Sequence, residues 1–319
     1  MHAVRLRELT KYFRVGFWRP RARRAIHRVT LDVAQGEVLG YLGPNGSGKT
    51  TTLKLLMQLL FPTSGSAEIL GRPAGDIDVR RRVAFLPEHP HFYDNLTAEE
   101  LLRYFAGLCG CDRHEANRRT STLLDRVGIG NERRLHLRKY SKGMLQRVGI
   151  AQALVNDPEV VFLDEPMSGL DPLGRRDIRQ LLLSLRGEGR TLFFSSHILS
   201  DAEAICSRVA ILSEGRLIAS GKLSELGLRV QGWELVVTGI TASRAKTLAS
   251  EANSVTRVAD GRYVIELPAH RPPEQVITAL VGSGAQIQSL NPHHETLEEF
   301  FVEQVTRQRE EDERQRVSA

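Results

Sequence analysis

Eight consecutive residues have the types and spacing of a loop that binds phosphate groups. They are Gly43, Pro44, Asn45, Gly46, Ser47, Gly48, Lys49 and Thr50, with Thr51 directly after them. Glycines let backbone N–H groups curl around a polyphosphate, and a helix that begins at the loop adds its positive end. In this pattern the lysine reaches the β- and γ-phosphates, and the hydroxyl of Thr50 ligates Mg²⁺. Because an apolar strand precedes the loop and a helical pattern follows it, we expect a polyphosphate site here.

A pair of acidic residues ends a short apolar strand further along the chain. Asp164 and Glu165 directly follow the valine-rich run 160–163, which is typical of a fully buried parallel strand. An aspartate at the carboxyl end of a strand beside a phosphate loop is placed to hold Mg²⁺. The following glutamate is placed to polarise a water as a general base. Such a pair is also common as a solvated turn, so the phosphate loop is what favours a catalytic role.

These two motifs must be brought to one edge of a sheet by the elements around them. Apolar strands are predicted at residues 37–42, 80–86, 160–163, 191–195 and 208–212. Helices are predicted at residues 53–60, 97–108, 114–127, 142–155, 174–186 and 199–205. This alternation predicts an α/β fold with a mostly parallel sheet that is covered on both faces. Residues 2–9 and 29–33 alternate as strands, and the basic, aromatic segment 17–24 is expected to form a hairpin tip.

A third motif carries a family resemblance. The sequence Tyr140-Ser141-Lys142-Gly143-Met144-Leu145-Gln146-Arg147 is similar to the signature of the ATPase subunits of ABC transporters. The resemblance implies a P-loop NTPase fold of ABC type that binds and hydrolyses ATP with Mg²⁺. It also implies that the helix opened by Ser141 closes on ATP held by a second ATPase subunit, in a homodimer or heterodimer. Ser141 and Gly143 are kept, whereas Lys142 and Met144 replace the usual Gly and Gln.

The role of Lys142 stays open between two alternatives at this point: added charge near the phosphate, or a side chain in solvent. Further positions match functional residues of the family. Asp171 ends a segment, SGLD, that resembles the loop communicating across the dimer. His197 stands where the family has a histidine that contacts the γ-phosphate and the general base. Tyr12 resembles the aromatic residue that stacks on adenine, with Phe13 and Trp18 as competitors.

Glu88 is the clearest departure from the family. It stands where the family commonly has a glutamine that bridges Mg²⁺ and the transport subunit. A glutamate still offers a hard oxygen to Mg²⁺, and it adds negative charge near Asp164 and Glu165. The resemblance implies metal ligation by Thr50, Glu88 and Asp164, with contact to the transport subunit at residues 89–105. This glutamate, the altered signature and the ending ETLEEFF resemble bacterial exporter ATPases.

A second, smaller domain is predicted after a boundary near residues 222–232. Its pattern is strand, helix, strand, strand, helix, strand, which is the order of the ferredoxin-like split unit. Asp260-Gly261 between two short strands is a hairpin signal. A last helix is expected at residues 296–305. The expected division is an ABC-type ATP-binding domain at 1–221, a small α+β accessory domain at 229–305, and a charged, frayed tail at 306–319.

Composition and charge exclude several other classes of protein. Of 319 residues, 41% are hydrophobic and 26% are charged, which excludes wholesale disorder. A net charge of +6 permits an anionic partner without requiring one, and three cysteines exclude a disulfide framework. Neither a signal peptide nor an apolar run long enough to cross a bilayer is visible.

The resemblance therefore predicts a cytoplasmic ATPase, peripheral on the inner face of the cell membrane, that drives separate transmembrane permease subunits. The alternative is a soluble ABC-type ATPase that acts on DNA or ribosomes. No heptad run separates Thr50 from Ser141, where DNA-repair members carry a coiled coil, and one ATPase unit is present where ribosome-acting members have two. Nucleic acid is not expected as a partner. The basic segment 19–24 fits either a membrane or partner contact or an ordinary solvated hairpin.

Overall fold

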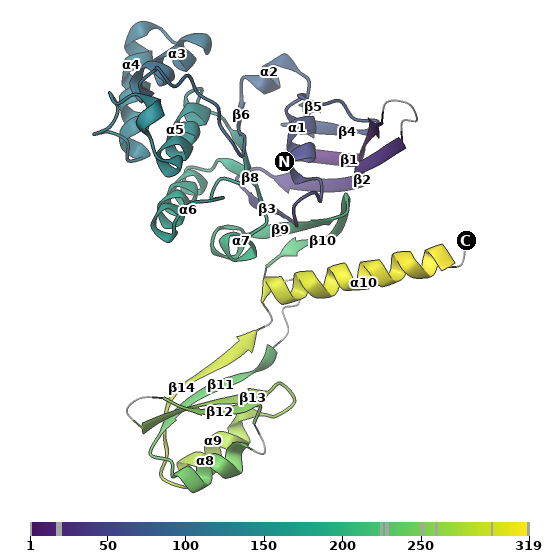
Figure 1. Cartoon of the computed structure of the whole chain (residues 1–319), viewed down its shortest axis with the longest axis vertical. Coiled ribbons are helices and arrows are strands. Elements are labelled where there is room, and N and C mark those ends of the chain that lie inside the picture. Colours follow the sequence, from purple (N-terminus) through teal and green to yellow (C-terminus); the bar gives the residue numbers. More distant parts are fainter. Residues whose placement is uncertain are drawn as a thin grey trace. The chain divides into compact units, whose positions relative to one another are not determined.

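The computed structural model describes residues 2–16, 21–223, 226, 230–249, 252–258, 261–294 and 296–317. The chain divides into two compact units, residues 1–223 with 304–319, and residues 224–303 (Figure 1). Three sequence features lie outside the described residues: the predicted hairpin tip at 17–20, which includes Trp18, Asp260 of the predicted turn, and Glu295. No helix in the described part of the chain is long and apolar enough to cross a membrane.

The larger unit alternates strands and helices along the chain. Its strands are β1 (His2–Val15), β2 (Arg21–Ala34), β3 (Val38–Leu42), β4 (Ser64–Ile69), β5 (Arg72–Pro73), β6 (Val83–Leu86), β7 (Val160–Asp164), β8 (Thr191–Ser196), β9 (Arg208–Ser213) and β10 (Arg216–Lys222). Its helices are α1 (Lys49–Leu56), α2 (Ile77–Arg80), α3 (Ala98–Leu108), α4 (Arg113–Arg126), the short 3₁₀ turn η1 (Leu137–Lys139), α5 (Lys142–Leu154), α6 (Pro172–Gly187) and α7 (Leu199–Ile205).

A six-stranded sheet in the order β10-β9-β3-β8-β7-β6 forms the centre of this unit. Its neighbouring strands pair in parallel, except that β10 runs antiparallel to β9. Strands β3, β7 and β8 are buried along their whole length, as expected when both faces are covered. The predicted α/β sheet is confirmed. Because β3, β7 and β8 are parallel, the loops that leave their carboxyl ends share one edge of the sheet.

A second sheet, antiparallel and in the order β2-β1-β4-β5, was only partly predicted. The predicted strands at its start pair as the β1–β2 hairpin, but residues 21–24 belong to β2 and not to a loop. Strands β4 and β5 were not predicted, because the sequence of β4, SGSAEI, has no apolar alternation. Leucines of α1 share one core with residues of both sheets. Helix α1 therefore joins the hairpin to the parallel sheet.

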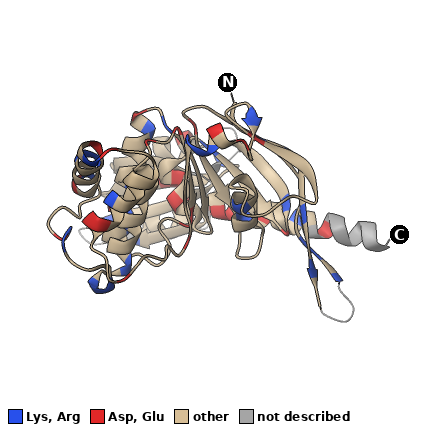
Figure 2. Ribbon diagram, turned by 90° about the horizontal axis from the view of Figure 1, so that it is seen from above, with Lys and Arg blue, Asp and Glu red and all other residues tan. Residues whose placement is uncertain are grey.

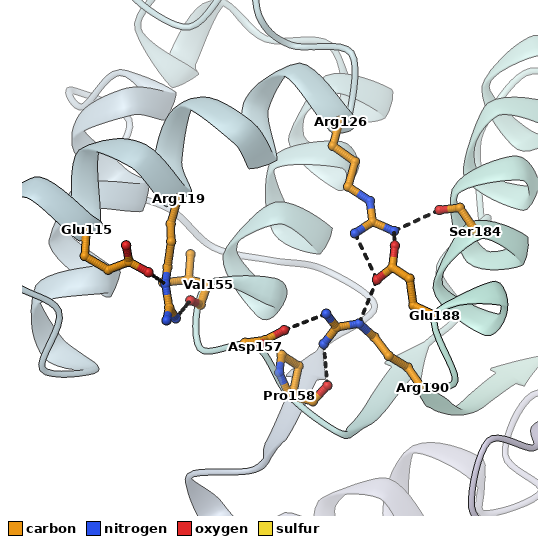
Figure 3. Close-up of polar contacts among 9 residues, drawn as sticks. All are labelled: Glu115, Arg119, Arg126, Val155, Asp157, Pro158, Ser184, Glu188 and Arg190. Atoms are coloured by element: carbon orange, nitrogen blue, oxygen red, sulfur yellow. Dashed lines mark hydrogen bonds and ion pairs between the residues drawn. The ribbon is translucent and has the colours of Figure 1, made fainter.

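Helices α3, α4 and α5 contact one another and form a separate helical group. A polar network ties this group to α6 and to the start of β8 (Figure 3). Arg126 at the end of α4 donates to Ser184 and Glu188, and Glu188 also accepts from Arg190. Arg190 in turn donates to the carboxylate of Asp157 and to the Pro158 carbonyl. The network lies at the amino ends of β7 and β8, away from the edge where their loops emerge.

Two helix boundaries in the larger unit differ from the sequence pattern. Helix α1 ends at Leu56, earlier than the apolar spacing suggested, because Gln58 adopts a left-handed φ of +55° that a helix cannot continue. The predicted strand 80–86 is shortened to β6, since Asp76 caps the short helix α2 directly before it. Asp76 accepts a hydrogen bond from the Asp78 N–H at 2.8 Å.

The smaller unit has the predicted β-α-β-β-α-β order. Its elements are β11 (Val230–Thr238), α8 (Ala242–Ala249), β12 (Ser254–Arg257), β13 (Arg262–Pro268), α9 (Pro273–Val281) and β14 (Gln286–His294). The strands form an antiparallel sheet in the order β12-β13-β11-β14, with a core that α8 and α9 help to fill. This order is that of the ferredoxin-like split unit.

The last helix, α10 (Leu297–Val317), is longer than predicted. The sequence pattern ended it at Val305 and left a frayed tail, whereas the helix continues through the charged segment. Arg, Glu and Gln are good helix formers, so this segment can continue a helix without an apolar stripe. The prediction of a frayed tail was wrong for residues 306–317.

Glycine positions in the core give a test of the packing. A Cβ at Gly40 in β3 would lie 2.8 Å from Cys206 Sγ and 3.3 Å from Ala202 Cβ. We expect Gly40→Ala to lower the free energy of unfolding by about 1–3 kcal/mol through overpacking. Gly107→Ala in α3 is the control, because nothing lies within 4 Å of its Cβ and alanine favours helix. Urea titrations of both variants check this, and equal stabilities would contradict the packing.

Candidate functional site

The phosphate loop leaves the end of β3 and enters α1 at Lys49. Gly43, Gly46 and Gly48 have φ values of +155°, +81° and +108°. A Cβ at Gly43 would lie 2.2 Å from the Leu212 carbonyl oxygen, and one at Gly48 would lie 2.5 Å from the Ala25 carbonyl oxygen. The loop is thus held between the end of β9 and strand β2, in contacts that only glycine permits.

Lys49 is buried and lies among three acceptors. Its Nζ donates to the carbonyl oxygens of Gly43, at 2.7 Å, and Pro44, at 3.2 Å. It also lies 3.3 Å from Glu165 Oε1, with both side chains less than a tenth exposed. The ammonium group therefore connects the phosphate loop to the acidic pair that follows β7.

A chain of hydrogen bonds fixes the acidic pair at the ends of β7 and β8. The Glu165 N–H donates to Ser195 Oγ at 3.0 Å, and the Ser195 hydroxyl donates to Asp164 Oδ1 at 2.6 Å. His197 contacts Glu165 Oε2 twice, through Nδ1 at 2.8 Å and through its backbone N–H at 3.3 Å. Glu165 itself has a left-handed φ of +50°. Its carboxylate lies between Lys49 and His197.

Ser195 is a site residue that sequence reasoning missed. It was counted as part of an apolar strand, yet parallel pairing sets it directly opposite Asp164. The signal was present in the two serines that end TLFFSS. A hydroxyl at the buried carboxyl end of a parallel strand has a polar partner when the neighbouring strand ends in an aspartate.

Asp164 is a buried carboxyl with two other acidic side chains near it. Burial raises the pKa of the Asp164 carboxyl, and the nearby charges of Glu165 and Glu88 raise it further. Hydrogen bonds from Ser195 and Thr50 act in the opposite direction and leave the pKa still raised. The carboxyls of Asp164, Glu165 and Glu88 therefore repel one another at the edge of the sheet, and a cation would relieve this.

A cavity of about 550 Å³ opens beside the phosphate loop. The predicted site residues that line it are Asn45, Gly46, Gly48, Lys49, Thr50, Thr51, Glu88 and Glu165. The β1–β2 hairpin contributes the other lining residues, Phe13, Val15, Arg23, Arg24 and Ala25. Gly43, Pro44 and Ser47 lie in the loop without lining the cavity. The loops at the edge of the parallel sheet, the start of α1 and the β1–β2 hairpin thus all line one cavity.

Tyr12 does not line this cavity. Its hydroxyl lies 3.1 Å from His27 Nδ1, and its ring meets the His27 ring edge-on. Among the described residues, Phe13, which follows Tyr12 along β1, is the aromatic side chain that lines the cavity. We therefore propose Phe13, one of the two competing residues, in place of Tyr12 as the residue that stacks on adenine.

Ser141, Gly143 and Asp171 lie outside the cavity of their own chain. Ser141 caps α5, its Oγ accepting from the Met144 N–H at 3.3 Å, and Asp171 caps α6, its Oδ1 accepting from the Gly174 N–H at 3.0 Å. The exposed Lys142 lies across Gly169, where a Cβ would be 2.2 Å from its Nζ. Neither helix start is among the groups that surround Lys49.

The comparison with known proteins gives the family. The model of the ABC transporter family matches residues 26–168. An uncharacterized ABC transporter ATP-binding protein of Synechocystis is 43% identical over 93% of this chain and 83% of its own length. The chain belongs to the ABC transporter ATP-binding proteins.

Other ABC proteins and structures agree with this assignment. The bacitracin transport ATP-binding protein of Enterococcus faecalis is 34% identical over 86% of this chain and 90% of its own length. A solved ATP-binding subunit of an ABC transporter has a TM-score of 0.62 and 32% identity, over 70% of this chain and 92% of its own. A dimeric ATP-binding cassette bound to ADP and Pi has a TM-score of 0.63 and 28% identity, over 69% of this chain and 98% of its own.

As an ABC ATPase, the chain is the ATP-binding subunit of a transporter and hydrolyses ATP. The predicted family, fold and enzyme class are confirmed. The P-loop NTPase fold of ABC type accounts for the six-stranded sheet, the second sheet and the helical group in one unit.

The positions of Phe13 and Tyr12 predict different effects on nucleotide affinity. We expect Phe13→Ala to weaken ATP binding by about 5–30-fold, because an aromatic face that stacks on a base contributes about 1–2 kcal/mol. Tyr12→Ala is the matched control and should change the Kd by less than about twofold. Isothermal titration with ATP measures both. A larger loss in Tyr12→Ala than in Phe13→Ala would return the stacking role to Tyr12.

Proposed function

We propose that the cavity beside Lys49 binds MgATP and that Glu165 is the general base for its hydrolysis. The observation that carries this proposal is the Glu165 carboxylate, held on the cavity wall between Lys49 and His197. A general base must lie within reach of the water it activates, and a carboxylate beside the γ-phosphate site meets that need. Gly43 to Thr51 would cradle the phosphates through backbone N–H groups and the start of α1.

Lys49 would change partners when ATP enters. Its ammonium group donates hydrogen bonds to two loop carbonyls and forms an ion pair with Glu165, whose Oε1 has no hydrogen-bond partner. An ammonium has three N–H donors, so a phosphate oxygen could accept from the third and compete with Glu165 for the positive charge. Replacing Glu165 would leave that carboxylate without its cation and free to accept a proton from water. His197, through Nδ1 and its backbone N–H, would keep the carboxylate oriented.

The residues near Asp164 fit Mg²⁺. Thr50, Glu88 and Asp164 supply only hard oxygen donors, and Asp164 is a buried carboxyl with the charges of Glu165 and Glu88 nearby, which a divalent cation would offset. Across the described residues, no three His, Cys, Asp or Glu side chains form a metal site by themselves, so phosphate oxygens would complete the coordination. Bound there, Mg²⁺ would neutralise charge that develops on the phosphates.

A second ATPase subunit would complete each site. Ser141, Gly143 and Asp171 lie away from the cavity of their own chain, yet the amino end of α5 offers N–H groups suited to an anion. We propose that these residues act on ATP held by the partner, in a head-to-tail homodimer or heterodimer. This arrangement makes each ATP a bridge between two chains, so that binding closes the dimer and hydrolysis opens it.

Separate transmembrane permease subunits would convert this cycle into substrate movement. We place their contact at residues 89–105, where the large side chains of Tyr93 and Tyr104 are exposed to solvent. The protein would then lie in the cytoplasm, peripheral on the inner face of the cell membrane. The unit of residues 224–303 would serve as an accessory domain of the ATPase subunit. Nucleic acid has no part in this proposal.

Removing the proposed base gives the first test. We expect Glu165→Gln to reduce the ATPase rate by about 10²–10⁴-fold while ATP binding persists, because the amide cannot accept the proton. The lost negative charge should also favour the ATP-bound dimer. Steady-state phosphate release and ATP-dependent size-exclusion mobility measure these effects. Glu68→Gln, on the exposed face of β4, is the control. Near-normal turnover in Glu165→Gln would disprove the assignment.

Mixed dimers test whether Ser141 acts on the partner's ATP. Lys49→Ala and Ser141→Arg should each be inactive alone, since both sites of each dimer are damaged. Mixed together they give dimers with one intact site and one doubly damaged site. Activity should therefore return, up to about half of the wild-type value per dimer if the sites fire independently. The shared site would be refuted if the wild-type protein stayed monomeric in the presence of ATP and hydrolysed ATP at a rate per molecule that did not depend on protein concentration.

A further inference from the structure

The β1–β2 hairpin places two arginines on the nucleotide cavity that the site described so far does not use. Arg23 and Arg24 of β2 line the cavity together with Phe13 of β1. Phe13 and Arg23 are direct cross-strand partners, so their side chains leave the sheet on the same face. Basic segments mark both strands near the described ends of the hairpin (Figure 2).

The charges on the cavity wall leave Arg23 available to a ligand. Lys49 is paired with Glu165 at 3.3 Å, and Arg24 lies 3.9 Å from Glu214 of the β9–β10 turn. Within the described part of the chain, the Arg23 side chain makes no ion pair or hydrogen bond. A guanidinium has five donors and no acceptor, so an unpaired one on a cavity wall suits an anion.

The position of this arginine favours the phosphate end of the nucleotide. The backbone carbonyl of Ala25, two residues after Arg23, occupies the space beside Gly48 at the start of α1. Gly48 belongs to the loop that cradles phosphates, so strand β2 reaches that loop two residues after Arg23. A phosphate chain also attracts a guanidinium more strongly than a base does, through charge-assisted hydrogen bonds.

We propose that Arg23 binds the phosphate chain of the nucleotide and so sets its affinity, with Arg24, held by Glu214, adding a second positive charge. This inference rests on the proposed function, in which the cavity holds ATP. Glu88 lines the same cavity, and the positive charge of Arg23 would reduce the repulsion between the Glu88 carboxylate and the phosphates. For these two arginines of the basic segment 19–24, the proposed partner is therefore the nucleotide bound by the same chain.

Nucleotide titrations of the full chain test this role. The variants are Arg23→Ala, Arg23→Lys and, as matched control on the same strand, Arg21→Ala, whose residue does not line the cavity. We expect Arg23→Ala to raise the Kd for ATP about 3–10-fold and the Kd for AMP by less, because AMP carries fewer phosphates. Arg23→Lys should restore part of the loss. The difference from wild type should shrink in about 0.5 M salt, as screening requires.

Three results would overturn the inference. Equal losses for ATP and AMP that salt does not change would move the contact to the base or ribose. An Arg23→Ala titration that matches Arg21→Ala would leave Arg23 without a nucleotide contact. If wild type and Arg21→Ala both fail to bind ATP while circular dichroism shows them folded, the proposed function itself fails, and this inference with it.

Discussion

The contact between Lys49 and Glu165 joins the two halves of the site, and the fold around it can be understood from this requirement. The lysine begins α1 after β3, and the glutamate follows β7, with β8 between the two strands. Only a parallel sheet brings the carboxyl ends of these strands to one edge. Both groups are buried, so each needs its partner, since an unpaired buried charge would be costly. The same pairing holds the carboxylate beside the phosphate loop.

The second sheet supplies the part of the cavity lining that does not come from the loops of the parallel sheet. The carbonyl of Ala25 packs against Gly48, which ties strand β2 to the phosphate loop through a contact that any side chain would block. The hairpin then extends from that point along the cavity and contributes an aromatic ring and two guanidinium groups. In our proposals, stacking and positive charge would therefore come from a sheet that carries none of the catalytic motifs. The hairpin would then affect nucleotide affinity through residues that do not contact the acidic pair.

The helix starts at Ser141 and Asp171 illustrate how local and distant roles can coincide. Each residue caps its own helix, which satisfies a backbone N–H that would otherwise lack a partner. Capping leaves the remaining amide groups of the first turn free to meet an anion. Because neither start faces the cavity of its own chain, the shared-site proposal follows from placement as well as from resemblance. Lys142, at the start of α5, lies across Gly169, two residues before the Asp171 cap of α6.

Sequence alone determined the parts of this protein that depend on local pattern. Glycine spacing identified the phosphate loop, and short apolar runs, one of them ending at Asp164, predicted the parallel strands. The sequence of strand and helix patterns predicted the order of elements in the smaller unit. Sequence could not separate Tyr12 from Phe13, because a strand turns neighbouring side chains to opposite faces and the irregular pairing of β1 with β2 decides which face meets the cavity. Nor could it place Ser195 beside Asp164 or Arg23 beside Phe13. Those contacts join residues far apart in the chain, and only strand pairing in the folded protein fixes which of them meet.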